Sequence, residues 1–116
     1  SDPPPEVHIV SPVRGSDFFK DERLDQYSAL RFKVGDTIRF AAVAKDRKDG
    51  WLADPAFRWS INWGERGPVQ CAARGTGSQM DFTVPPADVG WYWVEVSAKD
   101  SSGVTGEDYI TFKVER

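Results

Sequence analysis

Apolar and polar residues alternate with a period of two in short segments along most of the chain. The clearest segment is 57–63, FRWSINW, and the same alternation runs through residues 37–45, 80–84, 91–99 and 108–114. Successive side chains of a β-strand point to opposite faces of the sheet, so each segment predicts a strand with one face in a core and one face in solvent. The chain is therefore predicted to be all-β.

Two shorter strands complete the pattern, one around Val7 and Ile9 and one at residues 69–73. Glycine and proline separate the segments, and 116 residues fit one domain. About seven short strands with such turns are typical of an antiparallel β-sandwich. Trp59 lies in mid-strand among in-phase apolar residues, so we expect it to fill the space between the sheets, and we expect Tyr92 in the core as well.

Two parts of the chain interrupt this pattern. Residues 1–5 include three consecutive prolines, which predicts a stiff linker in front of a domain over residues 6–116. Residues 14–33 begin with a turn and continue as a charged stretch with weak helical periodicity, so we expect an insertion that carries a short helix. Residues 31–34, at its end, predict a brief additional strand.

Composition disfavours several classes of function. The net charge of −3 gives no global attraction for nucleic acid, and no apolar run approaches the ~20 residues of a membrane helix. We therefore expect neither nucleic-acid binding nor membrane insertion. The single cysteine, Cys71, excludes an internal disulfide and is expected to be a buried small apolar residue. The single histidine, His8, lies in the first strand, and no phosphate loop, nucleophile elbow or metal-spaced cluster is present, so we expect no enzymatic activity.

Several short motifs resemble one known family. They are Ser11-Pro12, VGDTIRF at 34–40, Asp46-x-x-Asp49-Gly50, FRW at 57–59, Gly-x-Tyr-x-Val-x-Val at 90–96 and AKDSSG at 98–103. Together they resemble PKD-like and related bacterial immunoglobulin-like domains, closest to the accessory domains found beside secreted sugar dehydrogenases and other extracellular enzymes.

The resemblance covers residues 6–114 apart from the 14–33 insertion. It implies an immunoglobulin-like antiparallel β-sandwich of about seven strands, acting as an accessory module of an extracellular, cell-surface or periplasmic protein. The stretch after Trp59 departs from the family, because many PKD domains have Trp-x-Phe-Gly-Asp-Gly where this chain has WSINWGERG. Since a fold does not fix a function, the residues themselves must supply the candidate sites.

Acidic residues recur in segments that are expected at one end of the sandwich. The loops after the second and sixth strands lie at the same end in this topology, which gathers Asp46, Asp49, Asp100 and Asp108. Carboxylate oxygens suit Ca²⁺, so these four residues are candidate calcium ligands. The alternative is a solvated charged rim, because lysines and arginines are interleaved with the aspartates. The 46–50 loop is not an EF-hand, since the third acid and the closing Glu are missing.

Three tryptophans are candidates for a partner or ligand face. If Tyr92 and Val94 face the core, Trp91 and Trp93 must face outward, and Trp51, which follows a loop, is expected to be exposed. Polar residues of the 57–63 strand and of the last strand are expected on the same outer face as Trp91 and Trp93. Exposed aromatic rings stack on sugars or anchor protein interfaces. A third alternative is that the 14–33 insertion covers them.

These observations favour one function and leave a second open. The first is a non-catalytic spacer and interaction module of an extracellular or periplasmic multidomain protein, with neighbouring domains, another protein or a glycan as its partner. The alternative is a carbohydrate-binding module that uses the outward-facing tryptophans.

Overall fold

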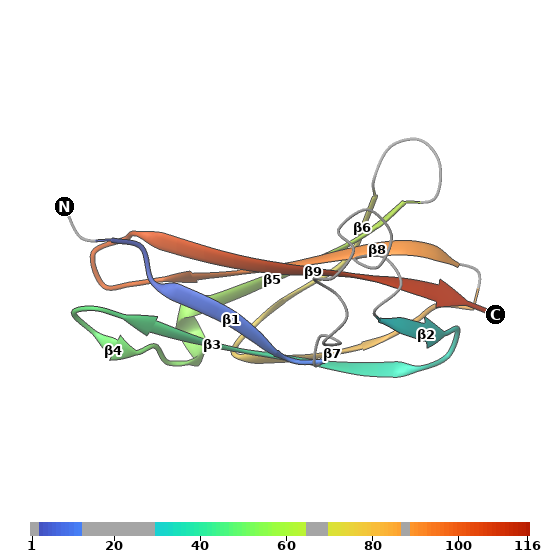
Figure 1. Ribbon diagram of the computed structural model, residues 1–116, viewed down its shortest axis with the longest axis horizontal. Helices are drawn as coiled ribbons and strands as arrows, with labels where there is room; N and C mark the ends of the chain where they lie inside the picture. Colours follow the sequence, from blue (N-terminus) through green and yellow to red (C-terminus); the bar gives the residue numbers. More distant parts are fainter. Residues whose placement is uncertain (1–2, 13–29, 65–69, 87–88) are drawn as a thin grey trace, which may run out of the picture.

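Two β-sheets pack face to face in the computed structural model, which describes residues 3–12, 30–64, 70–86 and 89–116 (Figure 1). The four-stranded sheet consists of β1 (Glu6–Ser11), β3 (Thr37–Asp46), β4 (Gly50–Trp51) and β7 (Gln79–Thr83). The five-stranded sheet consists of β2 (Arg31–Lys33), β5 (Phe57–Gly64), β6 (Gln70–Thr76), β8 (Gly90–Lys99) and β9 (Thr105–Glu115).

The strand order is that of an immunoglobulin-like sandwich, as the sequence predicts. In the four-stranded sheet β3 pairs with β1, β4 and β7, and the five-stranded sheet has the order β2-β9-β8-β5-β6. Every pairing is antiparallel except that of β2 with β9. The first and second strands thus belong to different sheets, and β5, β8 and β9 form the centre of the larger sheet.

The core lies between the two sheets and consists of the in-phase apolar residues of each strand. Trp59 is 2% exposed, and its indole Nε1 donates to the carbonyl of Gly77 over 2.6 Å. Tyr92 is also buried and stacks on Phe112, with ring centroids 5.0 Å apart. Phe40 packs against Trp59 from the opposite sheet at 6.0 Å. The predicted phases of these strands are confirmed.

The predicted insertion is only partly within the described residues. Its final residues form β2, where Phe32 pairs with Val114 and meets the ring of Phe112 edge-on at 5.3 Å. The brief additional strand is therefore confirmed, while the short helix predicted before it lies outside the described residues. A short 3₁₀ turn, η3 (Asp54–Ala56), precedes β5. No helix among the described residues is long and apolar enough to cross a membrane.

The start of β1 and the end of β9 lie at opposite ends of the sandwich (Figure 1). The turn between β3 and β4 and the turn between β8 and β9 lie at the end where β1 begins (Figure 1). Pro5, in the predicted linker, is buried, and its carbonyl oxygen lies where a side chain at Gly106 would have to go. The last linker residue is thus packed against β9.

Candidate functional site

The outer face of the five-stranded sheet carries most of the polar and aromatic residues that point away from the core. Residues directly opposite each other on antiparallel strands point to the same face, so the register defines rows of side chains across this surface. One row runs Asn62–Trp93–Thr111, and the next begins with Arg74 and ends with Tyr109. This surface is called the GF face below, and it comprises the outward side chains of β5, β6, β8 and β9.

Trp93 and Tyr109 form an exposed aromatic pair on the GF face. Trp93 is 43% exposed and Tyr109 is 60% exposed, and their ring centroids lie 6.2 Å apart in an edge-to-face arrangement. The amide of Asn62 donates to the backbone carbonyl of Trp93 over 3.4 Å, beside the rings. The alternation in β8 predicted that Trp93 points outward, and the structure confirms this direction.

Trp91 is on the same face but is less accessible. Its side chain is half-buried, and the ammonium of Lys113 lies 5.4 Å from the ring centroid, within the range of a cation–π contact. The alternative in which the 14–33 insertion covers the tryptophans depends on residues 14–29, which lie outside the described residues. Trp93 is therefore the tryptophan of this strand that presents the most ring surface.

Trp51 belongs to the opposite side of the molecule. It lies in β4, where it pairs with Lys45 of β3 in the four-stranded sheet. It is 68% exposed, and the Lys45 ammonium lies 5.3 Å from its ring centroid. The prediction that Trp51 is exposed is correct, but it does not share a face with Trp91 and Trp93. The hairpin pairing of β4 with β3, which the alternation did not predict, assigns it to the other sheet.

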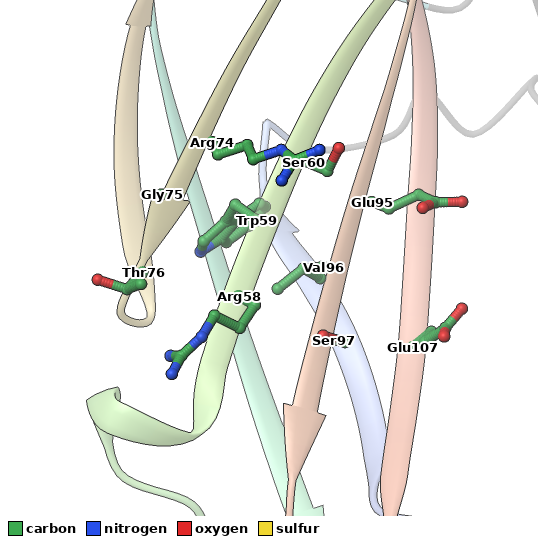
Figure 2. A pocket seen from close by; sticks show the side chains of 10 residues that line it. All are labelled: Arg58, Trp59, Ser60, Arg74, Gly75, Thr76, Glu95, Val96, Ser97 and Glu107. Carbon is green, nitrogen blue, oxygen red and sulfur yellow. The ribbon is translucent and has the colours of Figure 1, made fainter. Parts of the chain in front are cut away.

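A shallow groove of about 560 Å³ crosses the GF face, and Figure 2 shows the side chains that line it. It lies beside the aromatic pair, because Glu95 in its lining is directly opposite Tyr109. All of its lining residues lie in strands: Arg58, Trp59 and Ser60 in β5, Arg74, Gly75 and Thr76 in β6, Glu95, Val96 and Ser97 in β8, and Glu107 in β9. The sequence had indicated the outward direction of the β5 residues, but not the charged residues that the neighbouring strands add.

Two rows of this groove have the same chemical pattern. In the first row Ser60 pairs with Arg74 on one side and with Glu95 on the other. In the second row Ser97 pairs with Arg58 on one side and with Glu107 on the other. Figure 2 shows the arginines to one side of the serines and the glutamates to the other side. The groove therefore has a cationic wall, an anionic wall and a floor that includes two hydroxyl groups.

The charged side chains that line the groove, all of them described residues, form no ion pairs with one another. The Arg58 guanidinium donates to the backbone carbonyls of Pro55 and Phe57, at 3.3 and 3.1 Å. Within the described ranges no ion pair joins either arginine to Glu95 or Glu107. Within each row a serine separates the arginine from the glutamate, so these two backbones are about 10 Å apart, whereas Arg58 and Glu95 of different rows lie diagonally on the neighbouring strands β5 and β8.

The structure does not bring the four candidate calcium ligands together in one group. Asp46 is the last residue of β3, and Asp49 and Asp100 lie in the turns after β3 and β8. Asp49 accepts hydrogen bonds from the backbone N–H and the hydroxyl of Ser101, at 2.8 and 2.9 Å. Asp100 accepts the N–H groups of Ser102 and Val104. These contacts stabilise the two turns and join one to the other.

Asp108 does not take part in that group. Its carboxylate accepts the N–H of Ile9 over 2.8 Å, and in the sheet it is opposite Val96, which precedes Asp100 by four residues in the chain. It therefore links β9 to β1 instead of extending the acidic end. Within the part of the chain that the structure describes, no group of three or more His, Cys, Asp or Glu side chains is arranged to hold a metal ion.

Asp46 is the most buried of these carboxylates, at 3% exposure. Its Oδ2 accepts the backbone N–H groups of Asp49 and Lys48, at 2.9 and 3.0 Å. The Asp49 N–H makes the largest contribution in holding the pKa of Asp46 below its ordinary value, while burial acts in the opposite direction. The arrangement fits a carboxylate that caps a turn in its ionised form.

Cys71 is exposed, so its predicted burial is wrong. A bulge between Ile61 and Asn62 causes the difference, because Ile61 pairs with Ala73 whereas Asn62 pairs with Cys71. The extra residue of β6 at the bulge reverses the alternation, so Cys71 follows Asn62 to the outer side.

A scan against protein-family models finds no match for this chain, and a search of curated proteins finds no significant relative. The resemblance to PKD-like domains therefore stays a prediction from the motifs alone.

Proposed function

We propose that this chain is a non-catalytic spacer and interaction module that contacts its partner through the GF face. The observation that carries the proposal is the exposed Trp93–Tyr109 pair beside a groove whose Arg74, Glu95 and Glu107 have no ionic partner within the described residues. Exposed aromatic rings gathered on one rigid sheet are typical of a surface that a partner covers, and charges without an ionic partner remain available to bind it.

The positions of the chain ends support the spacer part of the proposal. Since β1 begins at one end of the sandwich and β9 finishes at the other (Figure 1), domains joined before and after this one would be held in series, separated by its long axis. The buried Pro5, packed near Gly106, would limit the freedom of a preceding domain. The parent would be an extracellular, cell-surface or periplasmic protein, as the motif resemblance suggests.

Hydroxyl-radical footprinting tests the interaction part of the proposal. The oxidation rates of Trp93 and Tyr109 would be compared between this chain alone and the longer protein of which it is proposed to be a module, at its native location. We expect slower oxidation of both rings in the native setting, because a partner covers them. Trp51, on the opposite sheet, is the internal control and should change little. Equal rates for Trp93 and Tyr109 in the two settings would contradict the proposal.

A further inference from the structure

We infer that the groove of the GF face binds an uncharged polysaccharide chain. The inference rests on the proposed function, because it names the partner class of the same face. It is carried by three properties of the groove: the spacing of its charges, their balance, and the aromatic pair at its side.

The spacing of the charges leaves room for a ligand. Within each row Ser60 or Ser97 separates the arginine from the glutamate by about 10 Å between backbones. Arg58 and Glu95 lie diagonally on neighbouring strands, but the Arg58 guanidinium donates to two backbone carbonyls and leaves Glu95 without an ion pair to any described residue. The side chains of each wall come from neighbouring strands, so the sheet fixes their positions. A ligand that lies over the two serines can contact an arginine on one side and a glutamate on the other.

The balance of charges selects the chemistry of that ligand. Two guanidinium groups and two carboxylates line the groove, so an anionic ligand would meet the wall of Glu95 and Glu107, and a cationic ligand the wall of Arg58 and Arg74. A hydroxyl group can accept a hydrogen bond from an arginine and donate one to a glutamate. A ligand with hydroxyl groups along both sides therefore satisfies both walls, and these charge-assisted hydrogen bonds are the stronger kind.

A protein partner would fit this groove less well. The buried centre of a protein interface is poor in charged residues, whereas four of the ten residues that line this groove are charged. A protein surface would have to supply a matching opposite charge at each of the four positions, or leave desolvated charges unpaired. A polyhydroxylated chain needs no such match.

The aromatic pair provides the remaining contact. Tyr109, on β9, is directly opposite Glu95 of β8, and Trp93 lies two residues before Glu95 on the same strand. Both rings therefore border the end of the groove that contains Ser60. The C–H faces of a sugar ring pack on such exposed aromatic faces. All lining residues lie on the open sheet, so a chain can extend across the groove beyond the residues in contact.

Affinity electrophoresis of the chain tests this inference. The gels would contain, one at a time, barley β-glucan, galactomannan, soluble starch or dextran, with alginate as the anionic comparison. The variants are Glu95→Gln, Arg74→Ala and Trp93→Ala, and the matched control is Trp51→Ala, which removes an exposed indole from the opposite sheet. Far-ultraviolet circular dichroism would establish that each variant is folded. We expect retardation by at least one neutral polysaccharide, and an affinity at least about tenfold lower in the three groove variants but not in the control.

Three results would overturn the inference. Retardation that is equal in the wild type and the groove variants, or that occurs only with alginate, would exclude the groove as a neutral polysaccharide site. No retardation by any of the neutral polymers would also overturn it. In that case, protection of Trp93 and Tyr109 in the footprinting experiment would leave the proposed interaction face standing with a protein as its partner, whereas unprotected rings would refute both.

Discussion

Replacing Trp59 by alanine should remove a large part of the free energy of unfolding. The indole is 2% exposed and packs at 6.0 Å against Phe40 of the other sheet. Truncation of a buried tryptophan costs about 3–5 kcal/mol, and loss of the Nε1 bond to the Gly77 carbonyl adds about 1 kcal/mol. A domain of this size has roughly 5–15 kcal/mol in total, so the variant should be close to unfolding.

Urea titration followed by circular dichroism, together with calorimetry, measures this loss. A total cost of about 5 kcal/mol, the middle of the resulting range, corresponds to a fall in melting temperature of roughly 20 °C at this chain length. Trp51→Ala is the matched control, since its ring is 68% exposed and its removal should change the free energy of unfolding by less than about 1 kcal/mol. Comparable stability of the two variants would refute the assignment of Trp59 to the centre of the core.

Three other predictions follow from single contacts. Gly106→Ala should destabilise the domain and release the N-terminal segment, because its Cβ would lie on the Pro5 carbonyl oxygen; limited proteolysis near residue 5 should be faster, and unchanged proteolysis would refute that packing. The lowered pKa of Asp46 contributes stability above the ordinary Asp pKa of about 3.9, and that contribution is lost as the pH falls through the lower folded-state value; Asp46→Asn should therefore flatten the acid side of the stability profile measured by urea titration. Millimolar calcium should leave the melting temperature unchanged, because both carboxylate oxygens of Asp49 are bonded to Ser101, and a rise that Asp46→Asn abolishes would contradict this expectation.

Local alternation predicted the strands because burial acts on each strand separately. A strand that puts Phe57, Trp59 and Ile61 on one side has only one way to exclude them from water, whatever its neighbours are. The same argument gave the outward direction of Trp93. It failed at Cys71, because the bulge in β6 is a property of the pairing with β5 and leaves no signal in the composition of β6.

The candidate site depends on information that no single segment contains. The alternation in β5 places Ser60 outward, but only the register places Arg74 on one side of it and Glu95 on the other. Likewise, the sequence could not distinguish the sheet of Trp51 from that of Trp93, since both rings are outward-facing and only the pairing of β4 with β3 separates them.

What the sequence alone determined is therefore the set of strands and the inner or outer direction of most side chains, because both follow from a period of two within one segment. What only the tertiary structure decided is which outward residues are neighbours: the two Arg–Ser–Glu rows, the separation of Trp51 from Trp93, and the bonding of Asp108 to β1 instead of to the acidic turns. The physical reason is that strand order and register are set by contacts between segments far apart in the chain, whose energies depend on both partners at once.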